Sequence, residues 1–158
     1  MKVRIYTDGA CSENPGPGGW ASVWICDDNI KVKSGCNPKT TNNQMELTAV
    51  VASLRRIVSN HCKGDIYEVY SDSAYVVNSI NNNWIERWRL NGWKTSKGDD
   101  VKNVELWMEC LKLLSQIRQM GVKLTFIKVK GHSGDTLNEY ADEVAKKEVL
   151  NARKVGIS

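Results

Sequence analysis

The sequence predicts a single α/β domain built on one five-stranded mixed sheet that is flanked by helices. Five short segments have the apolar pattern of strands, and amphipathic helical segments separate the last three of them. The first three strands follow one another closely, as in antiparallel hairpins, whereas a helix between two strands is typical of a parallel crossover. We therefore expect the strand order 3-2-1-4-5, with the second strand antiparallel. A length of 158 residues suits one domain.

The first strand begins at the N-terminus and runs toward an acidic residue. Val3 and Ile5 alternate with polar or amphipathic neighbours, which is the period of a strand with one buried face. The strand then reaches Asp8 and a stretch rich in glycine and proline, residues 9–19, which we expect to be a loop. An acidic residue before such a loop can build a metal or phosphate site, although an isolated Asp-Gly pair is more often a simple turn.

The next elements are two strands and a long helix. Residues 20–26 and 30–35 have strand patterns and are joined by a short turn. Residues 37–43 are rich in turn-forming residues, and apolar residues then recur at helical spacing over residues 45–59. Asn43 followed by Glu46 resembles a capping box, which predicts the start of this helix. The fourth strand, residues 66–71, runs out into Asp72.

The second half of the chain predicts three more helices and one strand. A short helix should start at Ser73, and a tryptophan-rich segment follows at residues 84–94. A further helix should begin near Val104 and end at Gly121, with Trp107 in the core. Residues 122–128 have a strand pattern, and Thr136 with Glu139 forms a second capping box for the last helix. We expect residues 151–158 to be a frayed tail.

Composition excludes several classes of protein. No apolar run approaches the roughly 18 residues of a membrane span, and the N-terminus enters a strand without a signal peptide. The five cysteines are odd in number and widely spaced, which argues against a disulfide framework and a structural zinc site. We therefore expect a cytoplasmic protein. The net charge of +4 permits a polyanionic partner without requiring one.

Four carboxylates should converge on one edge of the predicted sheet. Asp8 and Asp72 lie at the carboxyl ends of two strands that we expect to be neighbours and parallel, which is where ligands bind in open α/β sheets. Glu46 lies in the first turn of the helix between them, and Asp142 lies in the second turn of the last helix. Such a cluster would repel itself unless cations neutralised it, and oxygen ligands suit Mg²⁺ or Mn²⁺. Two such ions can clamp an in-line displacement at phosphorus.

Four ordered motifs carry a resemblance to a known family. They are Thr7–Cys11 with Asn14–Gly19, Thr40–Glu46, Ser71–Ser73, and Val129–Gly134 with Asn138–Asp142. The set resembles bacterial-type ribonuclease H of type 1 (ribonuclease HI) and is co-linear over residues 1–150. The resemblance implies a single ribonuclease H catalytic domain over residues 1–150. It also implies an endonuclease that hydrolyses the RNA strand of RNA–DNA hybrids and leaves 5′-phosphate and 3′-hydroxyl ends.

The resemblance also assigns roles to the acidic residues and to one histidine. The metal-binding acids of the family map onto Asp8, Glu46, Asp72 and Asp142, with Asp8 shared between two Mg²⁺ ions (Mn²⁺ being possible). The position of Glu46 implies a hydrogen bond from the ribose 2′-hydroxyl, which distinguishes RNA from DNA. His132 is expected to be a proton shuttle, because an imidazole can accept and donate a proton near neutral pH. A lone loop histidine could equally be an ordinary surface residue.

A second set of residues is expected to bind the hybrid. The tryptophan-rich segment resembles the basic protrusion that grips the DNA strand in some family members, although its net charge over residues 84–103 is only +2 from five basic and three acidic residues. Trp84 and Trp88, four residues apart, could instead belong to the core. Asn42 and Asn43 could instead cap the helix. The residues expected to contact the substrate are Asn14, Thr41, Asn42, Asn43, Gln44, Trp84, Trp88, Arg89, Trp93, Lys94 and Asn103.

Two other functions fit parts of this pattern. A transposase or junction resolvase of the same fold would need the carboxylates, but it would not explain the Gly-His-Ser-Gly motif, the tryptophan-rich segment or the short chain. A catalytically silent hybrid-binding module would gain by losing acidic residues that face phosphates. Nothing in the sequence encodes oligomerisation, so we expect a monomer that binds an RNA–DNA hybrid and no membrane.

Overall fold

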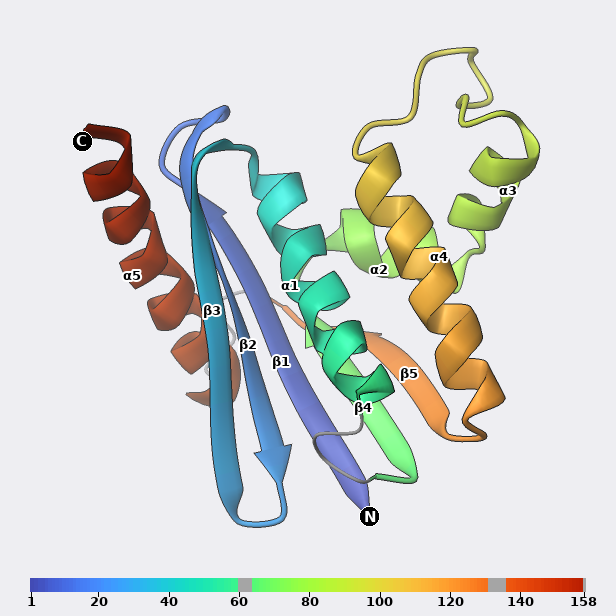
Figure 1. Ribbon diagram of the computed structural model, residues 1–158, viewed down its shortest axis with the longest axis horizontal. Coiled ribbons are helices and arrows are strands. Elements are labelled where there is room, and N and C mark those ends of the chain that lie inside the picture. Colours follow the sequence, from blue (N-terminus) through green and yellow to red (C-terminus); the bar gives the residue numbers. More distant parts are fainter. Residues whose placement is uncertain (60–63, 131–135, 158) are drawn as a thin grey trace.

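A computed structural model describes residues 1–59, 64–130 and 136–157 as a central sheet covered by helices on both faces (Figure 1). The strands are β1 (Lys2–Cys11), β2 (Gly16–Cys26), β3 (Asn29–Thr40), β4 (Ile66–Ser71) and β5 (Lys123–Lys128). The helices are α1 (Asn42–Val58), α2 (Ala74–Asn81), α3 (Trp84–Leu90), α4 (Val104–Gln119) and α5 (Thr136–Ile157). The predicted order of elements is therefore confirmed.

The sheet has the predicted order β3-β2-β1-β4-β5. β2 is antiparallel to both β1 and β3, whereas β4 is parallel to both β1 and β5. The parallel pairing of β1 with β4 matches Ile5 with Val69 and Tyr6 with Tyr70. This register carries both strands toward the same edge of the sheet, where Asp8 and Asp72 lie.

Two layers of helix bury the sheet. α1 and α4 lie side by side on one face, and α5 crosses the other face over β1, β2 and β3 (Figure 1). The larger core lies beneath α1 and α4 and contains Trp24, Leu47 and Trp107, each almost fully buried. Trp107 is thus a core residue, as predicted. No helix in the described part of the chain is both long and apolar enough to cross a membrane.

The glycine- and proline-rich stretch is largely strand and not the loop expected over residues 9–19. β1 continues to Cys11, and β2 begins at Gly16. The pairing of β2 with β3 shifts register between Gly16 and Gly18, so Pro17 lies at a bulge where no ladder hydrogen bond is required of it. The Asn14–Pro15 peptide bond in the connection is cis. Similarly, β3 extends to Thr40 through the segment predicted as a turn, and Pro38 is tolerated because β3 is an edge strand.

Helix boundaries also differ from the predictions in two places. Thr41, not Asn43, is the N-cap of α1, and its hydroxyl accepts a hydrogen bond from the Gln44 backbone nitrogen at 3.1 Å. At the other end of the chain, α5 continues to Ile157 and Ala152 is fully buried, so the C-terminal segment is helical and not frayed. Tertiary packing holds this segment in place.

Cysteine chemistry differs from the expectation in one respect. Cys26 is disulfide-bonded, whereas Cys11, Cys36 and Cys110 are free thiols. The odd number and wide spacing of the cysteines gave no indication of this bond, because pairing depends on which strands and loops the fold brings together.

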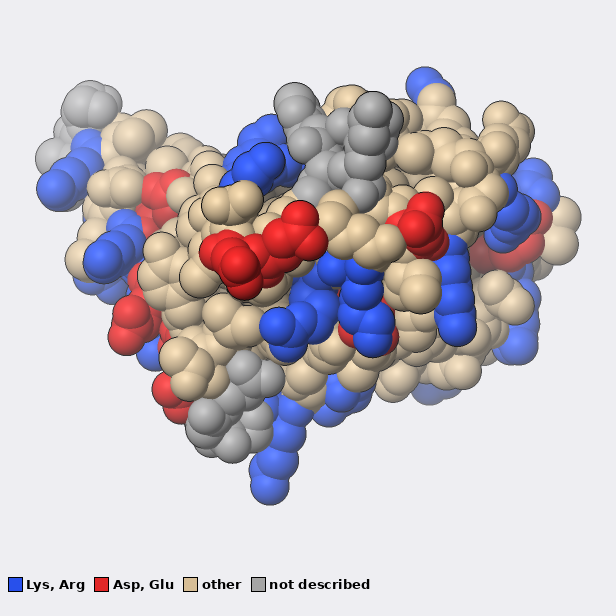
Figure 2. Space-filling view, turned by 90° about the horizontal axis from the view of Figure 1, so that it is seen from below, with Lys and Arg blue, Asp and Glu red and all other residues tan. Residues whose placement is uncertain are grey.

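Charge on the surface is mixed at the end of the sheet where β1 begins. Figure 2 views the molecule from that end and shows acidic and basic side chains interspersed. The described residues therefore form no continuous basic surface for a polyanion on this face.

Candidate active site

Three of the four predicted acidic residues lie together at the carboxyl edge of the parallel strands. Asp8 lies on β1, Asp72 directly follows β4, and Glu46 lies in the second turn of α1. One carboxylate oxygen from each lies within 4.8 Å of the others. Asp8 and Glu46 are buried, and Asp72 is partly exposed. The parallel pairing of β1 with β4 and the close packing of α1 on β1 bring these groups into one cluster.

Burial and mutual repulsion make this cluster unusually basic for carboxylates. The pKa of Asp8 is raised to about 7, first by burial and then by the charge of Asp72. The pKa of Glu46 is raised well above its ordinary value, first by burial and then by the charge of Asp8. Each group would release its proton more readily beside a cation, because the positive charge would offset both the cost of burial and the mutual repulsion.

One carboxylate oxygen without a hydrogen-bond partner indicates whether the cluster fits a metal. Oε2 of Glu46 is buried and has no hydrogen-bond partner among the described residues. A buried carboxylate oxygen without a partner is costly, and a cation ligated by that oxygen would relieve the cost. The three residues offer only oxygen ligands, which suit Mg²⁺ or Mn²⁺ better than zinc or copper. The residues present therefore fit a hard divalent cation.

Asp142 reaches the same cluster from the opposite face of the sheet. It lies on α5, and it raises the pKa of Asp8 both by a side-chain hydrogen bond and by its charge. Its own carboxylate also forms an ion pair with Lys146, one turn further along α5, at 2.9 Å. Asp142 thus interacts with Asp8 but is not one of the three residues whose ligand oxygens lie within 4.8 Å of one another, and it alone of the four acids has a basic partner among the described residues.

A hollow of about 400 Å³ opens beside the carboxylates and holds several of the predicted substrate residues. Its lining includes Asn42, Asn43, Glu46, Asp72 and Tyr75. The walls come from the start of α1, the end of β1 and the start of α2. Amide side chains and acidic groups therefore share one open surface.

The other predicted residues near α1 divide between structural contacts and the hollow. Oδ1 of Asn14 accepts a hydrogen bond from the Asn42 backbone nitrogen at 3.2 Å, which ties the β1–β2 connection to the start of α1. Thr41 caps α1 with its hydroxyl. Gln44 is partly exposed and contributes its backbone nitrogen to that cap. Capping is therefore done by Thr41, and the side chains of Asn42 and Asn43 are left to line the hollow.

Tyr75 links the hollow to the core, and sequence reasoning missed it. Its hydroxyl accepts hydrogen bonds from Nε1 of Trp107 at 2.8 Å and from Nδ2 of Asn103 at 3.2 Å. The ring also packs edge-on against Trp107 at 5.5 Å between centroids. Asn103, which has a positive φ of 60° before α4, is thereby tied to a residue that lines the hollow. The signal in the sequence was slight: Tyr75 stands three residues after Asp72 at the start of a helix.

The tryptophan-rich segment forms a second hollow, of about 470 Å³. It is lined by Trp84, Arg87, Trp88, Asn91 and Lys94, together with Thr95 and Ser96. Trp88 is also packed edge-on against Trp107 at 5.9 Å between centroids, so one side of it belongs to the core. Trp84 is more exposed, and Trp93 packs against the core. Arg87 was not among the predicted substrate residues, although it stands on the same helical face as Trp84 and Trp88.

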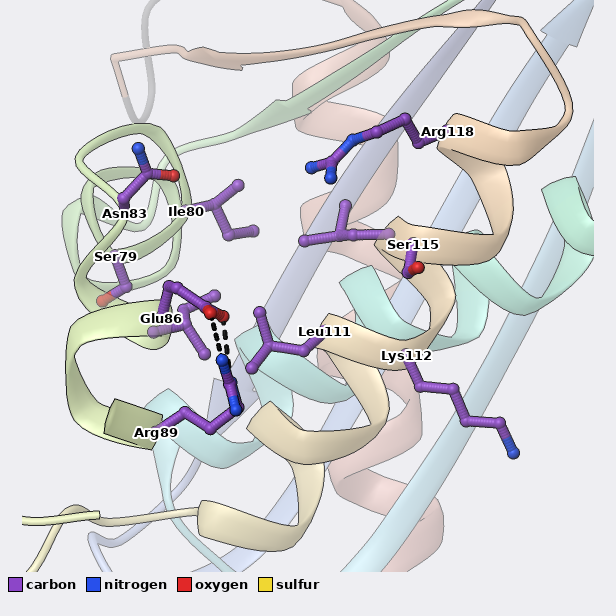
Figure 3. A pocket seen from close by; sticks show the side chains of 11 residues that line it. Ser79, Ile80, Asn83, Glu86, Arg89, Leu111, Lys112, Ser115 and Arg118 are labelled. Carbon is purple, nitrogen blue, oxygen red and sulfur yellow. Dashed lines mark hydrogen bonds and ion pairs between the residues drawn. The ribbon is translucent and has the colours of Figure 1, made fainter. Parts of the chain in front are cut away.

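Arg89 lies apart from this hollow. It lines a cavity of about 570 Å³ on the other side of α3, between α3 and α4, where it forms an ion pair with Glu86 (Figure 3). Arg118 reaches into the same cavity from α4, and the floor includes Ile80 and Leu111 (Figure 3). This cavity contains none of the predicted acidic site residues. Helical periodicity separates Arg87 from Arg89, because residues two apart on a helix do not share a face.

The remaining candidate, His132, lies outside the described residues, as does the rest of its Gly-His-Ser-Gly motif. The described residues around the site that the sequence did not single out are Tyr75, Arg87 and Lys146. Tyr75 and Lys146 act through a contact between elements or between helical turns, and no motif in the sequence marks that contact.

Comparison with known protein families accounts for nearly the whole chain. The sequence profile of the family described as RNase H matches residues 1–150. The ribonuclease H of Caldicellulosiruptor saccharolyticus is 49% identical over 152 residues, which cover 96% of this chain and 99% of that protein. The ribonuclease H of Acetivibrio thermocellus is also 49% identical, over 153 residues that cover 97% of this chain and 98% of that protein.

Solved structures agree with this relationship. LC9-RNase H1, described as a type 1 RNase H with the type 2 active-site motif, superposes with a TM-score of 0.77 at 27% identity. The match covers 96% of this chain and 73% of that one. LC11-RNase H1 in complex with an RNA/DNA hybrid has the same fold, with a TM-score of 0.68 at 23% identity over 95% of this chain and 98% of that one.

Proposed function

This chain belongs to the RNase H family, which cleaves the RNA strand of RNA–DNA hybrids, and we propose that it does so with divalent cations held by Asp8, Glu46, Asp72 and Asp142. The observation that carries this proposal is the carboxylate cluster, in which three ligand oxygens lie within 4.8 Å and one buried oxygen of Glu46 lacks a partner. We infer Mg²⁺ as the cofactor, with Mn²⁺ as an alternative, from the oxygen-only donor set.

The acidic residues would have different roles in binding the cations and the substrate. Two cations, when bound, would supply an activated water and stabilise the oxygen of the leaving 3′-hydroxyl. Asp8 lies between Glu46 and Asp142 and is suited to be shared, because it interacts with both. Glu46 and Asp72 line the hollow and would face the ribose, so that the 2′-hydroxyl can donate to Glu46. Cleavage in this arrangement leaves 5′-phosphate and 3′-hydroxyl ends.

Proton transfer would fall to His132, which stands in the Gly-His-Ser-Gly motif before α5. An imidazole with a pKa near neutrality can accept a proton from the attacking water or give one to the leaving oxygen. The four carboxylates are less suited to this task, since bound cations would hold them ionised.

The hybrid would be held by two groups of residues, one lining the hollow beside the carboxylates and one on the tryptophan-rich segment. Asn42 and Asn43, supported by Asn14 and Gln44, would contact sugars and base edges in the minor groove, while Thr41 and Asn103 would contact a phosphate of the DNA strand. The second group, on the tryptophan-rich segment, comprises Trp84, Arg87, Trp88 and Lys94, which line the second hollow, together with Trp93 beside the core. Their aromatic and basic side chains suit stacking on sugars and pairing with phosphates. The ion pair of Arg89 with Glu86 argues for a smaller contribution from Arg89.

Cleavage of a labelled RNA–DNA hybrid tests the proposal directly. The assay compares the hybrid with duplex RNA and duplex DNA, in Mg²⁺, in Mn²⁺ and in EDTA. Cleavage of the hybrid alone, dependent on the cation and lost in Asp8→Asn, is the expected result. Tight hybrid binding without cutting would instead favour a silent binding module, and cutting of duplex DNA would favour a resolvase or transposase.

A further inference from the structure

Asp142 differs from the other three acidic residues because a basic side chain already stands beside it. Nζ of Lys146 lies 2.9 Å from Oδ2 of Asp142, and both residues lie on α5, one turn apart. The Asp142 side chain is 26% exposed and the Lys146 side chain 63% exposed. The pair therefore stands at the outer rim of the carboxylate cluster, where it can open without disturbing the core.

An exposed Asp–Lys pair one helical turn apart is common and by itself adds little to the stability of a helix. The surroundings of this pair are less common. Asp142 also acts on Asp8, whose pKa it raises, and the pKa of Lys146 is raised first by the hydrogen bond to Asp142 and additionally by the charges of Asp8 and Glu143. Lys146 thus interacts with Asp142 and with the charge of Asp8, and it partly neutralises the Asp142 end of the cluster.

We propose that Lys146 is a positioning residue that serves as a built-in counter-cation for Asp142, and that a divalent cation must displace it before Asp142 can act as a ligand. This inference rests on the proposed function, because it concerns the cations that the cluster would hold. The other three acids have no such competitor among the described residues, so they form the stronger part of the site. Cations would therefore bind in order, first at Asp8, Glu46 and Asp72 and then at the Asp142 end.

Removing the charge of Lys146 should have two opposite effects. Without a cation, Asp142 would lose its partner and repel Asp8, so the melting temperature in EDTA should fall. With a cation, no ammonium group would have to be displaced from Asp142, so binding should tighten. Loss of an ordinary surface ion pair would lower the melting temperature but would not tighten cation binding. Both effects together would therefore show that Lys146 and the cation compete for Asp142.

Isothermal titration of the protein with Mg²⁺, without substrate and at low ionic strength, tests the inference. K146M keeps the aliphatic stem and should bind Mg²⁺ about 2- to 10-fold more tightly than the wild type. K146R keeps the charge and should stay within about 2-fold of the wild type. K147M is the matched control, since Lys147 is exposed on the same helix and has no ion pair with a described residue. It removes the same charge and should change the affinity by less than about 2-fold.

Equal Mg²⁺ affinities of K146M and K147M would overturn the inference and reduce Lys146 to a surface residue. That result would leave the proposed function intact, since hybrid cleavage by the wild type is measured separately. A wild-type protein that binds Mg²⁺ tightly but fails to cut the hybrid would instead refute the proposed function. The two failures are therefore distinguishable.

Discussion

Gly9 and Glu46 approach each other so closely that no side chain fits between β1 and α1. A Cβ atom at Gly9 would overlap the backbone nitrogen of Glu46 and would lie 2.6 Å from the carbonyl carbon of Met45. This contact sets the distance between the strand that carries Asp8 and the helix that carries Glu46. The backbone φ of Gly9 is one that other residues could adopt. Glycine is therefore required here by the close packing of α1 and not by the backbone conformation.

We expect Gly9→Ala to damage both stability and the metal site. The added methyl group must push α1 away from β1, which costs about 1–3 kcal/mol and separates Glu46 from Asp8. Thermal unfolding and Mg²⁺ titration measure the two effects. Gly156→Ala is the control, since a Cβ there meets only Pro38 at an ordinary 3.6 Å. Wild-type Mg²⁺ affinity in Gly9→Ala would contradict the role given to this contact.

The metal-free protein should lose stability as the pH rises from about 4 to about 7. The pKa of Asp8 is raised to about 7 in the folded state, so between these limits the folded state binds more protons than the unfolded state. Stability then falls with rising pH, by about 1–4 kcal/mol in total. Urea unfolding in EDTA across this range measures the slope.

Asp8→Asn is the matched variant for this measurement. It removes the titrating group and the repulsion, so its pH slope should be shallower and its melting temperature in EDTA equal to or above that of the wild type. A clear fall in that melting temperature would mean that Asp8 stabilises the metal-free fold, contrary to this account.

Arg87→Ala should weaken hybrid binding more than Arg89→Ala does. Arg87 lines the hollow with Trp84 and Trp88, whereas Arg89 is paired with Glu86 on the other side of α3. Loss of one phosphate contact should lower the slope of log affinity against log salt by about 1 for Arg87→Ala. Fluorescence anisotropy with a labelled hybrid, in EDTA to prevent cleavage, measures the affinity of each variant. The two variants have equal net charge, so a difference in affinity reflects the position of the arginine. Equal effects would indicate that only the overall charge of α3 matters.

Tyr75→Phe should destabilise the protein while leaving all four carboxylates unchanged. It leaves the buried Nε1 of Trp107 without its acceptor, which costs about 1–3 kcal/mol, and it releases Asn103. We therefore expect a lower melting temperature together with a higher KM for the hybrid. Urea unfolding and steady-state cleavage separate the two effects, and an unchanged KM would remove Asn103 from the substrate site.

His132→Ala should slow hybrid cleavage by about 10- to 10⁴-fold without abolishing it. The loss of one acid–base group typically has this size, whereas the carboxylates would still hold the cations. Single-turnover cleavage measures the effect, with Mg²⁺ affinity as the control. An unchanged rate would exclude His132 from proton transfer.

The sequence by itself determined the order of elements, the sheet topology and the clustering of Asp8, Glu46 and Asp72. These features follow from apolar periodicity, from crossover rules and from motifs at strand ends, all of which are local patterns. The tertiary structure decided the rest. It extended β2 and β3 through glycine and proline at a bulge and an edge, and it made residues 151–157 helical by burying Ala152.

Only the tertiary structure also decided which neighbours surround the acids. Gly9 fits against α1, Tyr75 joins Asn103 to Trp107, and Lys146 pairs with Asp142. Arg87 and Arg89 differ in role because α3 turns one toward the tryptophans and the other toward α4. Such contacts depend on how close two elements pack and on which face each side chain takes. A pattern along the chain therefore marks the ligands but not the residues that position or neutralise them.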